Sequence, residues 1–133
     1  MNQTRIKVKD VMKSNVDFVD GMKTVSDALE EMQHVETKAL IVKRRDENDE
    51  WGMVLLSDIA RKVLAHDKSA QRTNIYEIMS KPVLTIDQDM DIRYCARLFN
   101  QFKLSRAPVI HEKKIVGIIS LTDMVLKGLC TKT

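Results

Sequence analysis

Apolar residues recur with helical spacing in two stretches of the chain, and the two stretches match one another. In each stretch the apolar positions follow the order i, i+3, i+4, i+7, i+10, which places them along one face of a helix. Thr24 and Asp91 stand directly before the stretches and are suitable N-cap residues. The sequence therefore predicts two amphipathic helices. Their apolar stripes are Val25, Ala28, Leu29, Met32 and Val35 in the first, and Ile92, Cys95, Ala96, Phe99 and Phe102 in the second.

The match between the two stretches is part of a longer internal repeat. Residues 8–12 (VKDVM) recur 67 positions later as residues 75–79 (IYEIM). Further segments correspond in the same order: residues 38–42 with 106–110, 52–54 with 117–119, and 57–59 with 122–124. The offset changes only in the connections, where an insertion costs little. The chain is therefore a duplication.

Each copy is expected to fold as β-α-β-β-α. The predicted strands are residues 16–19, 39–43 and 51–56 in the first copy, and 83–86, 107–111 and 114–120 in the second. The last strand pair of the second copy has only Glu112 and Lys113 between its strands, which predicts a tight hairpin. The predicted organisation is a first repeat at residues 1–66, a polar linker at 67–74 and a second repeat at 75–133. Since a lone unit of about 60 residues is marginally stable, we expect an α/β fold in which the two repeats pack as a pseudo-two-fold pair.

A last helix is predicted to begin at Ser57 in the first copy and at Thr122 in the second. Its apolar face is expected to be buried, through Ile59, Ala60, Val63 and Leu64 in the first copy and Met124, Val125 and Leu129 in the second. Two small repeats cannot fully cover such faces, and exposed apolar patches favour a symmetric partner. We therefore expect a homodimer.

Composition excludes several classes of protein. The chain has 133 residues, of which 44% are hydrophobic and 31% charged, so it can bury a core and is not a disordered tail. No run approaches the roughly 18 apolar residues of a membrane span. The first residues alternate charge with isolated apolar positions and contain no signal-peptide run. We expect a soluble protein located in the cytoplasm.

The chain contains no recognisable catalytic or metal-binding motif. Cys95 and Cys130 lie far apart, and His34, His66 and His111 have no ligand-type residue at metal-site spacing. We therefore expect reduced thiols, no metal and no enzyme activity. The net charge of +3 raises nucleic acid as a partner, but the few scattered aromatic residues do not form a stacking platform. Nucleic acid is therefore not an expected partner.

The duplicated segments resemble paired CBS domains, the Bateman module. The resemblance covers about residues 8–129 and rests on the Val-Met and Ile-Met pairs before each first strand, on residues 106–110 (RAPVI) and on residues 117–123 (GIISLTD). It implies a regulatory or sensor module that takes part in signal transduction. It also implies an adenosine-type ligand in a cleft between the repeats: AMP, ADP or ATP ahead of S-adenosylmethionine or NAD. No cofactor is implied, and an effector protein is an open partner.

The resemblance also implies which residues bind the nucleotide. The family motif, Gly-x-x-Ser/Thr-x-x-Asp, is met at Gly117, Ser120 and Asp123. An ionised Asp can accept hydrogen bonds from a ribose diol, and a hydroxyl at a helix N-terminus can donate to phosphate. The implied nucleotide-binding residues are Thr85, Ile86, Arg106, Ala107, Pro108, Val109, Ser120 and Asp123.

The first copy departs from this pattern. Leu55 stands in place of Ser120, Phe18 stands in place of Thr85, and the proline is absent after Lys38 and Ala39, while Asp58 is retained. We expect this cleft, formed by Phe18, Lys38, Ala39, Leu55 and Asp58, to be degenerate.

Two alternatives remain open from the residues alone. Asp58 and Asp123 follow Ser or Thr at a predicted helix start, where a carboxylate also stabilises the helix dipole without any ligand. The whole chain could be a ligand-free dimerisation or protein-interaction module. The basic run at residues 43–45 and the acidic residues after it are expected to form a solvated loop.

Overall fold

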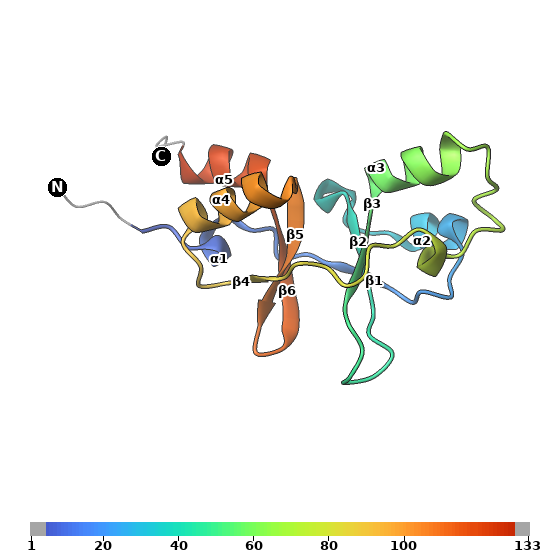
Figure 1. The fold of residues 1–133 in the computed structure, drawn as a ribbon, viewed down its shortest axis with the longest axis horizontal. Helices are drawn as coiled ribbons and strands as arrows, with labels where there is room; N and C mark the ends of the chain where they lie inside the picture. Colours follow the sequence, from blue (N-terminus) through green and yellow to red (C-terminus); the bar gives the residue numbers. More distant parts are fainter. Residues whose placement is uncertain (1–4, 130–133) are drawn as a thin grey trace. The chain divides into compact units, whose positions relative to one another are not determined.

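The computed structural model describes residues 5–129, and these form two compact units. One unit consists of residues 16–83, and the other combines residues 5–15 with residues 84–129. Each unit contains a three-stranded sheet with helices packed against it (Figure 1). The repeated β-α-β-β-α order predicted from the sequence is confirmed in both units. Cys130 lies outside the described residues.

The unit of residues 16–83 has the strand order β1-β2-β3. Its elements are β1 (Asp17–Val19), α2 (Val25–Glu31), β2 (Ala39–Val42), β3 (Gly52–Leu55) and α3 (Leu56–Ile59), which continues as a wider π-type turn over Ala60–Leu64. β1 and β2 are parallel because α2 connects them, whereas β2 and β3 are antiparallel and joined by a loop. All four residues of β2 are buried, as expected for a central strand.

The other unit repeats this arrangement with the strand order β4-β5-β6. Its elements are α1 (Val8–Val11), β4 (Ile86–Asp87), α4 (Ile92–Phe102), β5 (Arg106–His111), β6 (Lys114–Ser120) and α5 (Leu121–Gly128). The predicted tight hairpin is confirmed: Glu112 and Lys113 have φ values of 50° and 66°, as a type I′ turn requires. α4 and α5 lie side by side (Figure 1).

The segment that precedes the first strand of each copy packs into the unit that contains the sheet of the other copy. The amides of Val8 and Lys9 donate to the carbonyls of Met90 (2.8 Å) and Gln88 (2.9 Å), so α1 belongs to the unit of the second repeat. In the other unit, Val25 donates to the carbonyl of Thr73 (2.8 Å). Thr73, inside the predicted linker, is buried. The compact units and the sequence repeats therefore divide the chain differently.

Each unit has its own apolar core beneath its helices. The core of residues 16–83 comprises Val19, Val25, Ala28, Leu40, Val42, Val54, Val63, Ile75 and Ile78. The core of the other unit comprises Val8, Val11, Ile86, Ile92, Cys95, Phe99, Ala107, Val109, Ile119 and Met124.

The first amphipathic helix is shorter than its apolar spacing predicted. α2 ends at Glu31, and Val35 is 62% exposed. The carboxylate of Asp17 accepts hydrogen bonds from the amides of Gln33 (3.0 Å) and His34 (2.8 Å), which holds the chain out of the helix. The prediction that the stripe continues to Val35 was wrong. In the second copy, α4 does extend to Phe102.

The predicted burial of the last helices was only partly correct. Val63 and Met124 are buried, but Leu64, Val125 and Leu129 are 76%, 53% and 72% exposed. Asp123 and Met124 form the buried side of α5, and Val125 lies on its exposed side together with Leu126. Ala60 is exposed as well. The strand predicted at residues 83–86 also differs, because β4 begins only at Ile86.

Candidate functional site

A buried polar cluster lies where β6 ends and α5 begins. α5 starts at Leu121, one residue earlier than predicted, so Ser120 is its N-cap instead of Thr122. The Oγ atom of Ser120 accepts a hydrogen bond from the amide of Asp123 (3.1 Å) and donates one to Oδ2 of Asp123 (3.0 Å). Asp123 is only 4% exposed. The capping geometry therefore fixes a carboxylate in a nearly closed environment.

A cation that the sequence did not predict completes this cluster. The Nζ atom of Lys13 lies 2.7 Å from Oδ1 of Asp123. Lys13 is positioned by its backbone, which exchanges two 2.9 Å hydrogen bonds with Ile118 of β6. A buried carboxylate is costly without such a partner, and Lys13 supplies a partner of opposite charge to Asp123.

The alignment of the two copies contained a signal for Lys13. Lys13 aligns with Ser80 of the second copy, which in the unit of residues 16–83 exchanges the same pair of backbone hydrogen bonds with Met53, at 3.0 and 2.9 Å. The backbone arrangement is thus duplicated, while the cation is present in one copy only. The signal is that Lys13, whose amine lies at the motif carboxylate Asp123, aligns with the uncharged Ser80.

Gly117 allows the segment carrying Lys13 to approach the sheet. A Cβ atom at this position would lie 2.6 Å from Sδ of Met12 and 2.7 Å from the carbonyl oxygen of Lys13. Neither distance is compatible with a side chain. The glycine of the motif therefore has a packing role here, since it makes room for the chain that brings Lys13 to Asp123.

The equivalent position in the first copy lacks most of this chemistry. Leu55 precedes α3 and provides no side-chain cap. The half-buried Asp58 accepts a 2.9 Å hydrogen bond from the amide of Leu55, as a carboxylate in a first helical turn commonly does. The contacts of Asp58 in the described chain are those of a helix terminus.

The other residues proposed for the second-copy site divide into two groups. Arg106 pairs with Ser120 across β5 and β6, so it lies at the same end of the sheet as Asp123. Ile86, Ala107, Pro108 and Val109 are buried. Ile86, Ala107 and Val109 belong to the apolar core, and Ile86 pairs with Val109 between β4 and β5. Thr85 is half-buried directly before β4. The structure thus brings Arg106, Ser120 and Asp123 together, and it adds Lys13.

Four of the residues proposed for the degenerate cleft lie at one end of the sheet, where Ala39 pairs with Leu55 and the amide of Leu56 donates to the carbonyl of Lys38 (3.0 Å). Phe18 is 42% exposed, and its ring centre lies 6.0 Å from that of Trp51. Lys38 is exposed, and its backbone is in the left-handed region (φ 58°). Ala39 is buried and pairs with the half-buried Leu55.

Within residues 5–129, no three His, Cys, Asp or Glu side chains are grouped so that they could hold a metal ion. In the same range, no helix has the length and apolar character needed to cross a membrane.

Comparison with known proteins places the chain in a family. The profile of the CBS domain matches residues 8–65 and 75–128. CBS domain-containing protein CBSX3, mitochondrial, of Arabidopsis thaliana is 27% identical over 89% of this chain and 62% of its own length. The chain spans about half the length of several curated relatives that it matches.

Solved structures share the fold. A hexameric CBS-CP12 protein from bloom-forming cyanobacteria is 38% identical, with a TM-score of 0.87 over 92% of this chain and 70% of that one. A CBS domain pair in complex with 5′-methylthioadenosine and S-adenosyl-L-methionine is 23% identical, with a TM-score of 0.77 over 96% of this chain and all of that one. Both CBS matches lie on the duplicated sheets described above, and the chain therefore belongs to the CBS domain family as a tandem pair.

Proposed function

We propose that this tandem CBS pair is a sensor that binds an adenosine-type nucleotide through the cluster around Asp123. The observation that carries the proposal is a 4% exposed carboxylate held by a serine hydroxyl and a lysine amine at a helix N-terminus. Such a carboxylate is oriented before any ligand arrives. It is suited to accept hydrogen bonds from the two hydroxyls of a ribose.

The surrounding charges fit the rest of such a ligand. Lys13 is 29% exposed along its side chain and lies at the carboxylate. Arg106 lies across from Ser120. With Lys13 at the carboxylate and Arg106 at the same end of the sheet, we infer that an anionic ligand is favoured, so AMP, ADP or ATP fits better than an uncharged nucleoside. A related fold whose structure holds 5′-methylthioadenosine and S-adenosyl-L-methionine supports the adenosine class.

A regulatory role follows from the same features. CBS domains match residues 8–65 and 75–128, and the candidate ligand cluster lies within the matched residues. Ligand binding would act by stabilising one conformation of the pair, which is then recognised by an effector.

Calorimetry with matched variants tests this proposal. AMP, ADP, ATP, S-adenosylmethionine and NAD are titrated into the wild-type chain. One ligand is expected per chain, because the unit of residues 16–83 has Leu55 and Ser80 where the other unit has Ser120 and Lys13. Asp123→Ala is expected to weaken binding by about 10- to 150-fold, the equivalent of roughly 1.5–3 kcal/mol for a charge-assisted hydrogen bond. Asp58→Ala is the control at the matching helix terminus and should leave affinity unchanged. Equal affinities in all three proteins, or two equivalent sites, would refute the assignment.

A second candidate function is a ligand-free interaction module. The observation that favours it is that Lys13 and Ser120 already engage both oxygens of Asp123. In addition, Val125, Leu126 and Leu129 of the last helical segment are all more than half exposed, and the cyanobacterial CBS-CP12 protein is hexameric. An absence of any heat with all five ligands, together with an oligomeric mass, would favour this function.

A further inference from the structure

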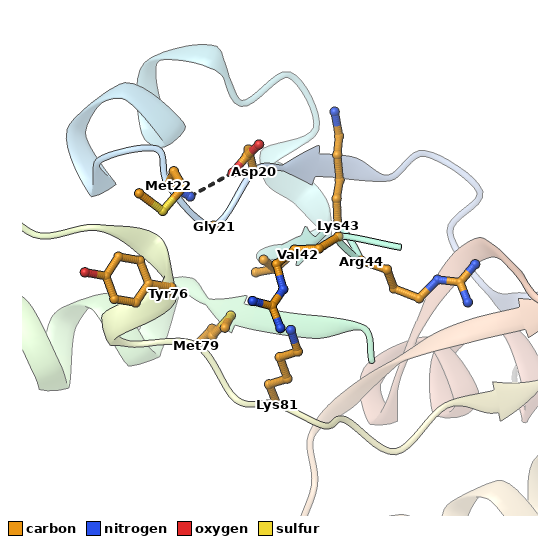
Figure 2. A pocket seen from close by; sticks show the side chains of 10 residues that line it. Asp20, Gly21, Met22, Val42, Lys43, Arg44, Tyr76, Met79 and Lys81 are labelled. Atoms are coloured by element: carbon orange, nitrogen blue, oxygen red, sulfur yellow. Dashed lines mark hydrogen bonds between the residues drawn. The ribbon is translucent and has the colours of Figure 1, made fainter. Parts of the chain in front are cut away.

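The unit of residues 16–83 contains a cavity of about 580 Å³ that the CBS motif does not involve (Figure 2). Three segments line it: the turn after β1 at residues 20–22, the end of β2 at residues 42–45, and the segment carrying Tyr76, Met79 and Lys81. It opens at Val42, the last residue of β2, whereas the motif carboxylate Asp58 lies at the first end of that strand, where Ala39 pairs with Leu55. The volume is typical of small-molecule sites, which span roughly 300–1,000 Å³.

One side of the cavity is apolar. Figure 2 shows Tyr76 and Met79 following one another along one edge, with Gly21 and Met22 across from them and Val42 between. The amide of Tyr76 donates to the carbonyl of Gly21 (2.9 Å), so the two edges are tied together at one end. The ring of Tyr76 is half exposed. A flat apolar group could therefore lie on this wall without displacing other side chains.

The other side is cationic. Lys43, Arg44, Arg45 and Lys81 line the cavity, and Asp20 is the one carboxylate among its described lining residues. The guanidinium of Arg44 lies 4.8 Å above the ring of Trp51, which orients it. Figure 2 shows Lys43 directed away from Lys81. The aliphatic stem of Lys43 therefore lines the cavity, and its amine faces outward. The basic run expected to be a solvated loop is thus partly a cavity wall.

Asp49 fixes two of these cations. Its side chain is 9% exposed and lies 2.7 Å from Nζ of Lys81 and 3.1 Å from Nε of Arg45. The amide of Arg45 also donates to it (2.9 Å). Lys81 and Arg45 hold the pKa of Asp49 well below its usual range, so this anchor stays charged at all ordinary pH values.

Arg45 retains hydrogen-bonding capacity after this contact. Of the described residues, Asp49 is the one that bonds the Arg45 side chain, and it takes the Nε proton. The two terminal amino groups remain, on a side chain that is 84% exposed. A planar guanidinium with its stem fixed and its terminal donors available is well suited to a phosphate oxygen.

We propose that this cavity binds an organic phosphate, with its flat apolar body against Tyr76 and Met79 and its phosphate at Arg45 and Lys81. The site is separate from the Asp123 cluster and does not depend on it. Its ligand is recognised by two features together, and neither a bare nucleoside nor a bare phosphate satisfies both.

The test is a titration followed by amide NMR on the full chain. Asp123→Ala is used as the background, so that a nucleotide bound at Asp123 does not contribute. Millimolar pyrophosphate and ADP are the probes, and saturable shifts are expected at Gly21, Lys43 and Tyr76. Arg45→Gln should weaken both probes by about tenfold or more. Tyr76→Ala should weaken ADP and leave pyrophosphate unchanged, because it removes only the apolar wall.

Lys68→Gln is the matched control, since Lys68 is an exposed cation of the same unit that does not line the cavity. It should leave both affinities unchanged. The proposal is overturned if neither probe shifts these three amides, or if Lys68→Gln weakens binding as much as Arg45→Gln. The latter result would mean that general positive charge attracts the probes. Because the background already lacks Asp123, neither outcome bears on the nucleotide site proposed there.

Discussion

The amine of Lys13 lies 2.7 Å from a carboxylate oxygen of Asp123, a residue 110 positions later in the chain. The two side chains are 29% and 6% exposed, so the ion pair is shielded from water mainly on the carboxylate side. The pair joins the segment before residue 16 to the start of α5. It therefore links the stability of this unit to the chemistry of its candidate site.

Replacing Lys13 by Met should destabilise the protein. The Asp123 carboxylate would lose a charged hydrogen-bond donor in a nearly closed environment, at a cost of about 1.5–3 kcal/mol in the free energy of unfolding. Urea denaturation measures this. Lys9→Met is the control, because Lys9 pairs with Asp89 where both side chains are more than two-fifths exposed, and such pairs contribute little. Equal losses of unfolding free energy in the two variants would show that the buried pair contributes no more to stability than the exposed one.

Gly117→Ala should destabilise the second-repeat unit by about 1–3 kcal/mol, the usual cost of overpacking. The new methyl group would lie 2.7 Å from the carbonyl oxygen of Lys13, which belongs to the backbone and cannot turn aside. Gly21→Ala is a matched control, since the nearest atoms there are 3.5 Å away. Thermal unfolding should show a clear decrease for Gly117→Ala and little change for Gly21→Ala. The opposite order would contradict the packing.

Asp49→Asn should lower stability in a pH-dependent manner. The pKa of Asp49 is depressed in the folded chain from its ordinary value of 3.8, chiefly by Lys81 and then by Arg45. A depressed acid stabilises the fold above its unfolded pKa, and this contribution is lost as the pH falls toward the folded value. The stability difference between wild type and Asp49→Asn should therefore be full at neutral pH and shrink below about pH 4. A difference that stays constant from neutral to acidic pH would contradict the ion cluster.

The thiol of Cys95 should be nearly inert in the native protein. Cys95 lies on the buried side of α4, and burial raises its pKa to about 11. The thiolate is the reactive form, so alkylation of a Cys130→Ser variant should be slow at mildly alkaline pH and increase sharply in denaturant. Mass spectrometry over time measures both rates. Similar rates in the folded and unfolded protein would mean that the thiol is accessible.

The exposed face of α5 should mediate self-association. Leu126 is 62% exposed and neighbours Val125, which is 53% exposed. If a second copy covers this face, Leu126→Asp should convert a dimer into a monomer, as measured by light scattering at micromolar concentration. Lys127→Glu is the control on an adjacent exposed position and should leave the mass unchanged. A monomeric wild-type chain would contradict the predicted homodimer.

The duplication and most elements could be predicted from local pattern. The stripe on α4, the caps at Thr24 and Asp91, and the hairpin at Glu112 and Lys113 all depend on residues close in sequence. The end of α2 could not be predicted in this way, because it is determined by the carboxylate of Asp17, which precedes the helix and bonds to the chain beyond it.

The candidate site was predictable to the same extent. Ser120 and Asp123 were identified from the family motif, which is a local pattern, and the structure adds that Ser120 caps α5 by accepting from the amide of Asp123. Lys13 could not be identified from spacing, since it reaches Asp123 through strand-like pairing with Ile118 across most of the chain. The cavity at Val42 was missed for a similar reason: its three lining segments are brought together only by the fold.

The division of the chain into units has a consequence for its biosynthesis. Residues 16–83 are contiguous, so their sheet can close as soon as they have left the ribosome. Val8, Val11 and Lys13 are translated before residues 16–83, whereas their partners in β6 and α5 are translated after them. The segment of residues 8–13 must therefore wait, with its apolar side chains uncovered, while a complete unit forms behind it. During that interval this segment of the nascent chain is exposed to chaperones and to aggregation.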